Sequence, residues 1–135
     1  MDDREFVALF ESCTLPPDSF SHRNHVRLAW LYLKEEPLLA ALDRFRRSLK
    51  RYAGSLGAAA KYHETITFAF LFLIHERMQA AADAETFEEF AARNPELFEK
   101  ILLRYYREET LASPLARAVF VMPDAVAAQP AANRW

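Results

Sequence analysis

Glycine is scarce in this chain: only Gly54 and Gly57 occur among 135 residues. Proteins rich in β-hairpins need many backbone positions with positive φ, which glycine supplies, so this scarcity argues against such folds. The apolar residues instead recur at helical spacing. The sequence therefore predicts an all-α domain, a compact bundle of roughly five to seven helices.

Cysteine and long apolar runs are also scarce. Cys13 is the single cysteine, so no intramolecular disulfide can form, and we expect it to be an inert, small, partly buried residue. The chain opens with charged residues rather than the apolar stretch of a signal peptide. The longest apolar run, residues 66–74, is far shorter than the roughly 20 residues of a membrane span. These features predict a cytoplasmic protein that does not bind membranes.

Neither sign of charge dominates. The 17 Lys and Arg residues nearly balance the 19 Asp and Glu residues, giving a net charge of −2. No strong field therefore favours a nucleic-acid partner. One predicted helix carries five basic residues that we interpret as a solvated face: Arg44, Arg46, Arg47, Lys50 and Arg51. The hydrophobic fraction of 52% suffices for one core. We expect one domain over residues 1–122 and a loosely ordered Ala/Pro-rich tail over 123–135.

Helix boundaries follow from capping residues and prolines. Ser21 and Thr86 are expected N-caps, and Glu89 completes a capping box with Thr86. Gly54 and Gly57 are candidate C-caps. The predicted helices cover residues 2–12, residues 21–34, a segment from Pro37 to the two glycines, residues 62–82, a segment from Thr86, a segment from Asn94-Pro95 that carries Leu97, Ile101 and Tyr105 on one face, and a short segment from Ser113 to Val119.

Two of these helices are predicted to be central. The helix at 21–34 has almost no polar face, and residues 66–74 of the helix at 62–82 are apolar on all sides, so both should be buried. Short connections make consecutive helices antiparallel neighbours. The second and fourth helices should therefore be parallel, with their N-terminal ends at the same end of the bundle.

Three of the four histidines lie at those two N-terminal ends. His22 and His25 are three residues apart, hence on one helical face, and His63 and Thr67 are four apart on another. A helix N-terminus disfavours imidazolium, so these rings should be neutral, the form that binds a metal or accepts a proton. We therefore expect His22, His25 and His63 to converge, as ligands of one divalent transition metal (Zn, Fe, Ni or Cu) or as acid/base groups.

The residues around His63 do not form the two-histidine metalloprotease motif, because Thr67 stands where the second histidine is required. Glu64 points about 100° away from His63 on an ideal helix and suits a partner of the helix dipole better than a ligand. Cys13 should lie near the same end of the bundle. Whether Glu64 or Cys13 takes part in the site stays open.

Three classes of function remain possible, the last of which is a nucleic-acid-associated module that uses the basic helix face. The first is a small enzyme or binding protein with a histidine-lined pocket, in which Arg27, Thr67 and Tyr105 orient a small-molecule ligand. A metal there would act as a Lewis acid or generate hydroxide, and without one a histidine would act as general base. The second is a non-catalytic ligand-sensing or protein-interaction module in which the histidines are structural.

Two segments carry a resemblance to known sequences. They are residues 20–30, with the pattern F-x-H-x-x-H-x-R-x-A-W, and residues 61–67, with the pattern K-Y-H-E-T-x-T. Both resemble a family of small bacterial all-helical proteins of uncharacterised function. The resemblance extends through Tyr105 and Tyr106 to Asp124 and implies no activity. It draws attention to the same two segments.

Overall fold

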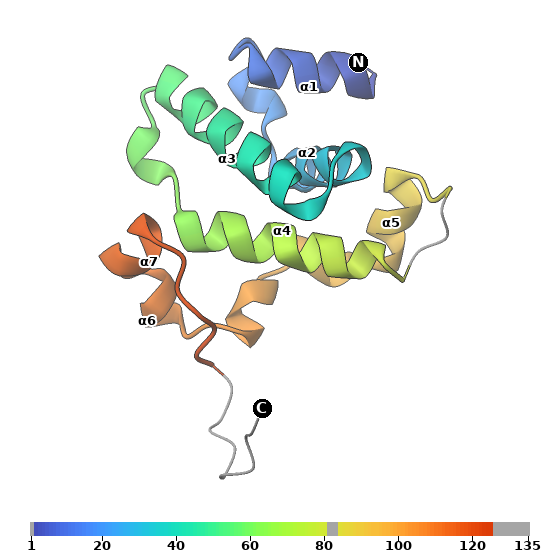
Figure 1. Ribbon diagram of the computed structural model, residues 1–135. Coiled ribbons are helices and arrows are strands. Elements are labelled where there is room, and N and C mark those ends of the chain that lie inside the picture. Colours follow the sequence, from blue (N-terminus) through green and yellow to red (C-terminus); the bar gives the residue numbers. More distant parts are fainter. Residues whose placement is uncertain (1, 81–83, 126–135) are drawn as a thin grey trace.

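The structure, a computed structural model, describes residues 2–80 and 84–125. Within these ranges the chain forms seven α-helices, four short 3-10 turns and no strand (Figure 1). The helices are α1 (Asp3–Glu11), α2 (His22–Glu35), α3 (Leu38–Ser55), α4 (Glu64–Met78), α5 (Phe87–Arg93), α6 (Glu108–Leu111) and α7 (Pro114–Ala118). The predicted all-α bundle is confirmed. None of these helices has the length and apolarity that a bilayer span requires.

The predicted helix starts are set by the expected side chains. Ser21 accepts a hydrogen bond from the Asn24 amide and begins α2. Thr86 and Glu89 form the complete capping box of α5. Ser113 accepts from the amide of Ala116 at the start of α7. Each cap satisfies an amide that the helix itself leaves without an acceptor.

Two helices end in a left-handed residue. Gly57, with φ of +69°, follows α3 as predicted. Cys13 has the same role after α1, with φ of 62°: its amide donates to the Phe10 carbonyl and the Thr14 amide donates to the Leu9 carbonyl. This hydrogen-bond pair is the Schellman motif, whose left-handed position favours glycine. Cys13 therefore occupies a strained backbone position.

The predicted helix from Pro95 is wrong. The segment forms two 3-10 turns instead, η3 (Pro95–Phe98) and η4 (Ile101–Arg104). In an α-helix the Leu97 carbonyl would accept from the amide of Ile101. In the structure His22 bonds that carbonyl, at 3.0 Å. A long-range contact thus takes the place of a helical hydrogen bond at this carbonyl. The short helix α6, which comes next in the chain, was not predicted.

Helices α2 and α4 lie side by side and run in the same direction. The first half of α2 faces residues 66–74 of α4 across a small cavity. Near the end of α2, Trp30 packs on Phe87 and Phe90 of α5, the helix that follows α4, with ring centres 5.6 and 6.4 Å apart. The parallel arrangement predicted for the two central helices is therefore confirmed, and α3 crosses above α4 (Figure 1).

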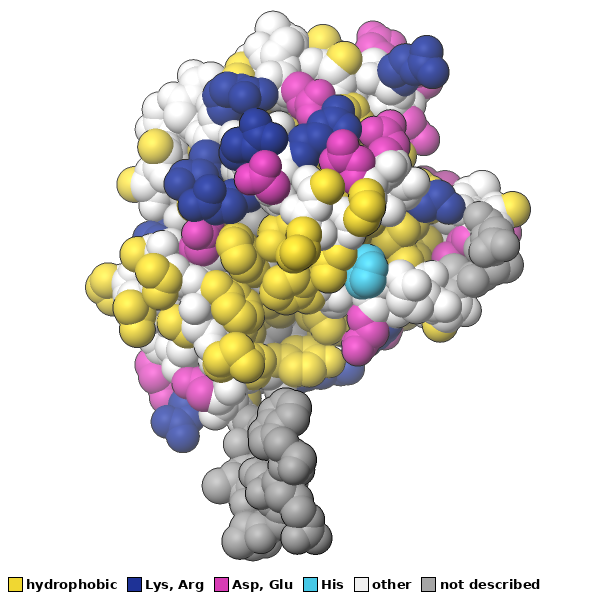
Figure 2. Space-filling view, viewed as in Figure 1, with side chains coloured by type: hydrophobic (Ala, Val, Ile, Leu, Met, Phe, Trp, Pro, Cys, Tyr) yellow, Lys and Arg dark blue, Asp and Glu magenta, His cyan; other side chains and the backbone are white. Residues whose placement is uncertain are grey.

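The apolar sequence of α4 predicts a helix that is buried on all sides. In the structure α4 is central, but part of its surface is not enclosed. Phe68 and Phe72 are only half-buried. Their rings contact the ring of Phe120, with centres 5.6 and 5.9 Å away. Figure 2 shows the apolar region that surrounds this part of the molecule. The helix therefore buries one side against α2 and α3 and covers the other only in part.

Side-chain hydrogen bonds attach the last described residues to the helices. Buried Thr65 of α4 donates to the Val119 carbonyl at 2.8 Å and accepts from the Val121 amide at 3.1 Å. The Asp124 carboxylate accepts from the Arg107 amide at 2.9 Å and from the Thr110 hydroxyl. The predicted tail begins at residue 123, and its residues 126–135 lie outside the described part of the chain.

The basic side chains of α3 are largely paired with carboxylates. Arg44 donates to Glu11 of α1 at 2.8 Å, and Arg47 donates to Asp43 at 3.0 Å. Basic and acidic side chains alternate on this part of the surface (Figure 2). Carboxylates therefore offset much of the positive charge on this helix face.

Candidate functional site

A pocket of about 340 Å³ lies where α2, α3 and the start of α4 meet. We call it the His25–His63 pocket. Its walls include Phe20, Tyr52, Tyr62, His25, His63 and Thr67. His63 and Thr67 form a buried floor, whereas Leu56 and Lys61 stand exposed at the rim. Two of the three predicted histidines thus share one pocket, together with the predicted Thr67.

His22 lies next to this pocket rather than in it. A smaller cavity of about 100 Å³, which we call the bridging cavity, is lined by His22 and His25 and by Ile66 and Phe70 of α4. His25 therefore faces both spaces. The three histidines lie at one end of the two parallel helices. They line two neighbouring cavities, however, and do not surround one point.

His25 is the histidine best placed to meet a ligand. Its ring stacks on Phe20 and lies against Phe45, with ring centres 5.2 and 5.5 Å away. Burial, with a smaller contribution from His22, lowers the pKa of His25 to about 4. The ring is therefore neutral at pH 7 and can both donate and accept a hydrogen bond. No described residue forms a hydrogen bond with its nitrogens, although both neighbouring histidines form such bonds.

His63 is fully engaged by the protein. It is the N-cap of α4: its Nδ1 accepts from the Ile66 amide at 3.1 Å. Its Nε2 lies 2.7 Å from the Leu111 carbonyl, which can only accept, so Nε2 carries the proton. A metal ion would have to displace one of these bonds. Among residues 2–80 and 84–125 no group of three or more His, Cys, Asp or Glu side chains is arranged to hold a metal ion.

His22 makes one long-range hydrogen bond. Its Nε2 donates to the Leu97 carbonyl at 3.0 Å, across 75 residues of sequence. Its ring meets those of Phe70 and Phe98 edge-on, with ring centres 5.4 and 6.1 Å apart. His22 also lines a third space, a groove of about 490 Å³ between α4 and the η3–η4 segment, which we call the His22 groove.

Glu64 does not join the histidines. Arg46 of α3 binds both of its carboxylate oxygens, at 2.8 and 3.1 Å, and the Tyr62 hydroxyl donates to it at 2.6 Å. Burial alone would raise the pKa of Glu64, but the bonds from Arg46 and Tyr62 outweigh it and hold this pKa below its ordinary value. Burial and the bond to Glu64 in turn raise the pKa of Tyr62. The cluster fixes one wall of the His25–His63 pocket.

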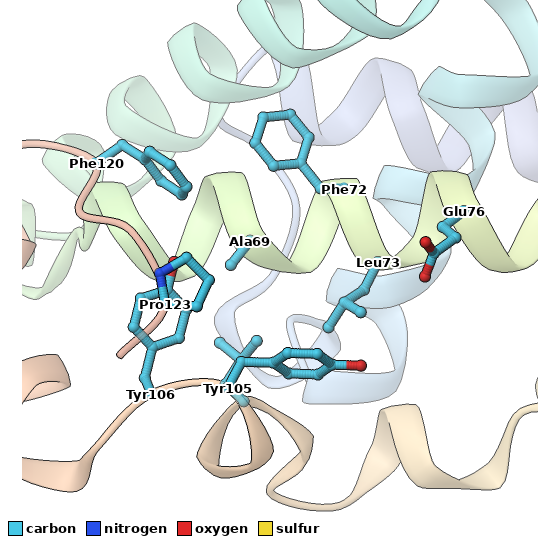
Figure 3. A pocket seen from close by; sticks show the side chains of 9 residues that line it. Ala69, Phe72, Leu73, Glu76, Tyr105, Tyr106, Phe120 and Pro123 are labelled. Carbon is cyan, nitrogen blue, oxygen red and sulfur yellow. The ribbon is translucent and has the colours of Figure 1, made fainter. Parts of the chain in front are cut away.

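The structure separates two predicted ligand-binding residues from this pocket. Arg27 pairs with Asp3 of α1, and its guanidinium lies 4.8 Å from the centre of the Phe6 ring. Tyr105 lines a different pocket, of about 220 Å³, beside Leu73 and Glu76 on the α6–α7 side of α4 (Figure 3). The inference that placed Tyr105 near the histidines assumed a helix from Pro95, which does not form.

Sequence reasoning did not identify the aromatic walls. Phe20 precedes the N-cap of α2, and Tyr62 precedes His63. Tyr52 lies on the buried face of α3, and that face, at Leu49, Tyr52 and Ala53, lines the pocket. Phe20 and Tyr62 lie close in the sequence to the predicted histidines, which was the available signal. Aromatic residues at such positions are equally typical of an ordinary hydrophobic core.

Comparison of the chain with family models, with curated proteins and with solved structures gave no match. Its function must therefore be argued from the geometry of its own side chains.

Proposed function

We propose that this protein binds a small organic molecule in the His25–His63 pocket. The observation that carries the proposal is His25, a neutral imidazole held between aromatic rings at the pocket wall. Ligand sites are characteristically concave and largely apolar, with a few well-placed polar groups and volumes of roughly 300–1,000 Å³. The pocket, at about 340 Å³, has this character.

The chemistry of His25 supports binding more than proton abstraction. A general base works best when its pKa lies near the operating pH. With a pKa of about 4, His25 is a weak base at pH 7, although it remains a good hydrogen-bonding group. A ligand that combines a polar group with an apolar body would match His25 and the rings of Phe20 and Tyr52. The single cysteine supports a cytoplasmic location for this binding protein.

A fluorescent probe tests the proposal. 1-Anilinonaphthalene-8-sulfonate, an aromatic anion, should bind the full chain at one site. Ala53 lines the pocket, so Ala53→Trp should fill it and weaken binding by about tenfold or more, because the probe must find equivalent space elsewhere. Ala40→Trp is the matched control, since Ala40 lies on the same helix and is exposed.

The result depends on comparing the two tryptophan variants at equal folded fraction, measured by circular dichroism. Equal probe affinity in both variants and the wild type would place the probe elsewhere and overturn the proposal. His25→Phe, which preserves the ring stacking, gives a second reading: it should weaken probes that carry a hydrogen-bonding group and leave purely apolar probes unchanged.

A further inference from the structure

The three cavities near the histidines share walls. His25 and Ile66 line both the His25–His63 pocket and the bridging cavity. His22, Ile66 and Phe70 line both the bridging cavity and the His22 groove. Ile66 of α4 thus borders all three spaces. From the His25–His63 pocket through the bridging cavity to the His22 groove, their volumes are about 340, 100 and 490 Å³.

The walls of this series are mainly apolar. Phe20, Phe45, Phe70 and Phe98 follow one another from the pocket to the groove, and Ile66 stands at the junction. The histidines contribute ring faces and edges as much as polar atoms, because they pack against these phenyl rings. A row of adjacent apolar spaces that share wall side chains fits an elongated apolar body better than a compact one.

Charge distinguishes the two ends. Lys61 stands at the rim of the His25–His63 pocket, and Lys50 lies 5.3 Å above the Tyr62 ring. Glu64, three residues after Lys61, is neutralised by Arg46. At the far end the groove is bordered by Glu99 and Lys100 together, so its charges offset. The pocket end is therefore the cationic end.

From this geometry we propose that the ligand is a long-chain aliphatic acid, with its carboxylate near Lys61 and its chain running past Ile66 into the His22 groove. This inference rests on the proposed function and specifies its ligand. A chain of methylenes fills a narrow series of cavities, and each methylene that leaves water adds to the affinity. A short acid would occupy the His25–His63 pocket alone.

A chain-length series tests this. Hexanoate, decanoate and dodecanoate are titrated against the full protein by calorimetry, below their micellar concentrations. Dodecanoate should bind at least about tenfold more tightly than hexanoate, because its additional methylenes are buried beyond Ile66. Equal affinities, or tighter binding of the short acid, would overturn the inference.

Ile66→Trp should block the junction and remove the gain in affinity from hexanoate to dodecanoate, so that the two acids bind this variant about equally. Phe68→Trp is its control, because Phe68 is on α4 but lines none of the three cavities. If Ile66→Trp fails to fold, Ile66→Ala tests the same junction. The smaller side chain widens the junction and should tighten dodecanoate binding relative to hexanoate binding. Unchanged chain-length dependence in a folded Ile66 variant contradicts the proposed path.

The head-group assignment has its own test. Lys61→Gln should weaken dodecanoate severalfold and leave dodecanol unchanged, because only the acid carries a charge. If the anilinonaphthalene probe still binds and Ala53→Trp still excludes it, failure of the fatty-acid series refutes this inference alone. Loss of that probe result would refute the proposed function itself.

Discussion

The imidazole of His63 donates to the carbonyl of Leu111, 2.7 Å away and 48 residues later in the sequence. Its other nitrogen caps α4 through the Ile66 amide. One side chain therefore fixes both the start of the central helix and the position of the C-terminal third of the chain. This arrangement also explains why a residue expected to bind a metal has neither nitrogen free.

Replacing His63 should test that dual role. His63→Ala should lower the free energy of unfolding by about 2–3 kcal/mol, through loss of the cap and of the partner for a carbonyl. His63→Asn should lose roughly half as much, because asparagine also caps helices well. Urea unfolding measures both. A loss no larger than that of His75→Ala, further along α4, would show that the two bonds contribute little.

Acid should destabilise the protein through His25. The ring titrates near pH 4 when folded and near pH 6.5 when unfolded, so at pH 4–6.5 the unfolded state binds more protons. Its contribution to stability is complete above pH 6.5 and is lost as the pH falls toward 4, by about 3 kcal/mol at most. In His25→Phe this part of the pH dependence should disappear. Identical profiles in the two proteins would contradict the shifted pKa.

Relief of the strained turn after α1 should stabilise the fold. Cys13→Gly should raise the free energy of unfolding by about 1 kcal/mol, because glycine adopts positive φ without steric cost. Cys13→Ala keeps a Cβ and should stay close to the wild type. Thermal unfolding distinguishes them. If glycine and alanine have the same effect, backbone strain at this position is not the cause.

Metal analysis tests the interpretation first made from the three histidines. Protein purified without a histidine tag should carry less than one transition metal per chain, and added zinc should leave its Tm unchanged, because His63 uses both ring nitrogens. One zinc per chain that is lost in both His22→Gln and His25→Gln would support the metal site predicted from the sequence.

Local signals predicted much of the fold. Ser21, Thr86 and Ser113 act within one helical turn, so their roles are visible in the sequence. The grouping of His25 with His63 followed from short connections and from two apolar helices. The sequence could not reveal which backbone carbonyl, far away along the chain, accepts a hydrogen bond from each histidine. In the structure the Leu97 carbonyl accepts from His22, and the segment from Pro95 forms 3-10 turns instead of the expected helix, so the predicted approach of Tyr105 is lost as well.

Side chains from the first two-thirds of the chain donate hydrogen bonds to backbone carbonyls of the last third and so fix its position. His22 binds Leu97, His63 binds Leu111 and Thr65 binds Val119. The residues they hold form only short helices and turns, whose local hydrogen bonds are few. The conformation of residues 95–125 therefore depends on hydrogen-bond donors that α2 and the start of α4 supply. An isolated peptide of that segment has no template, and limited proteolysis should cut there before it cuts α2, α3 or α4.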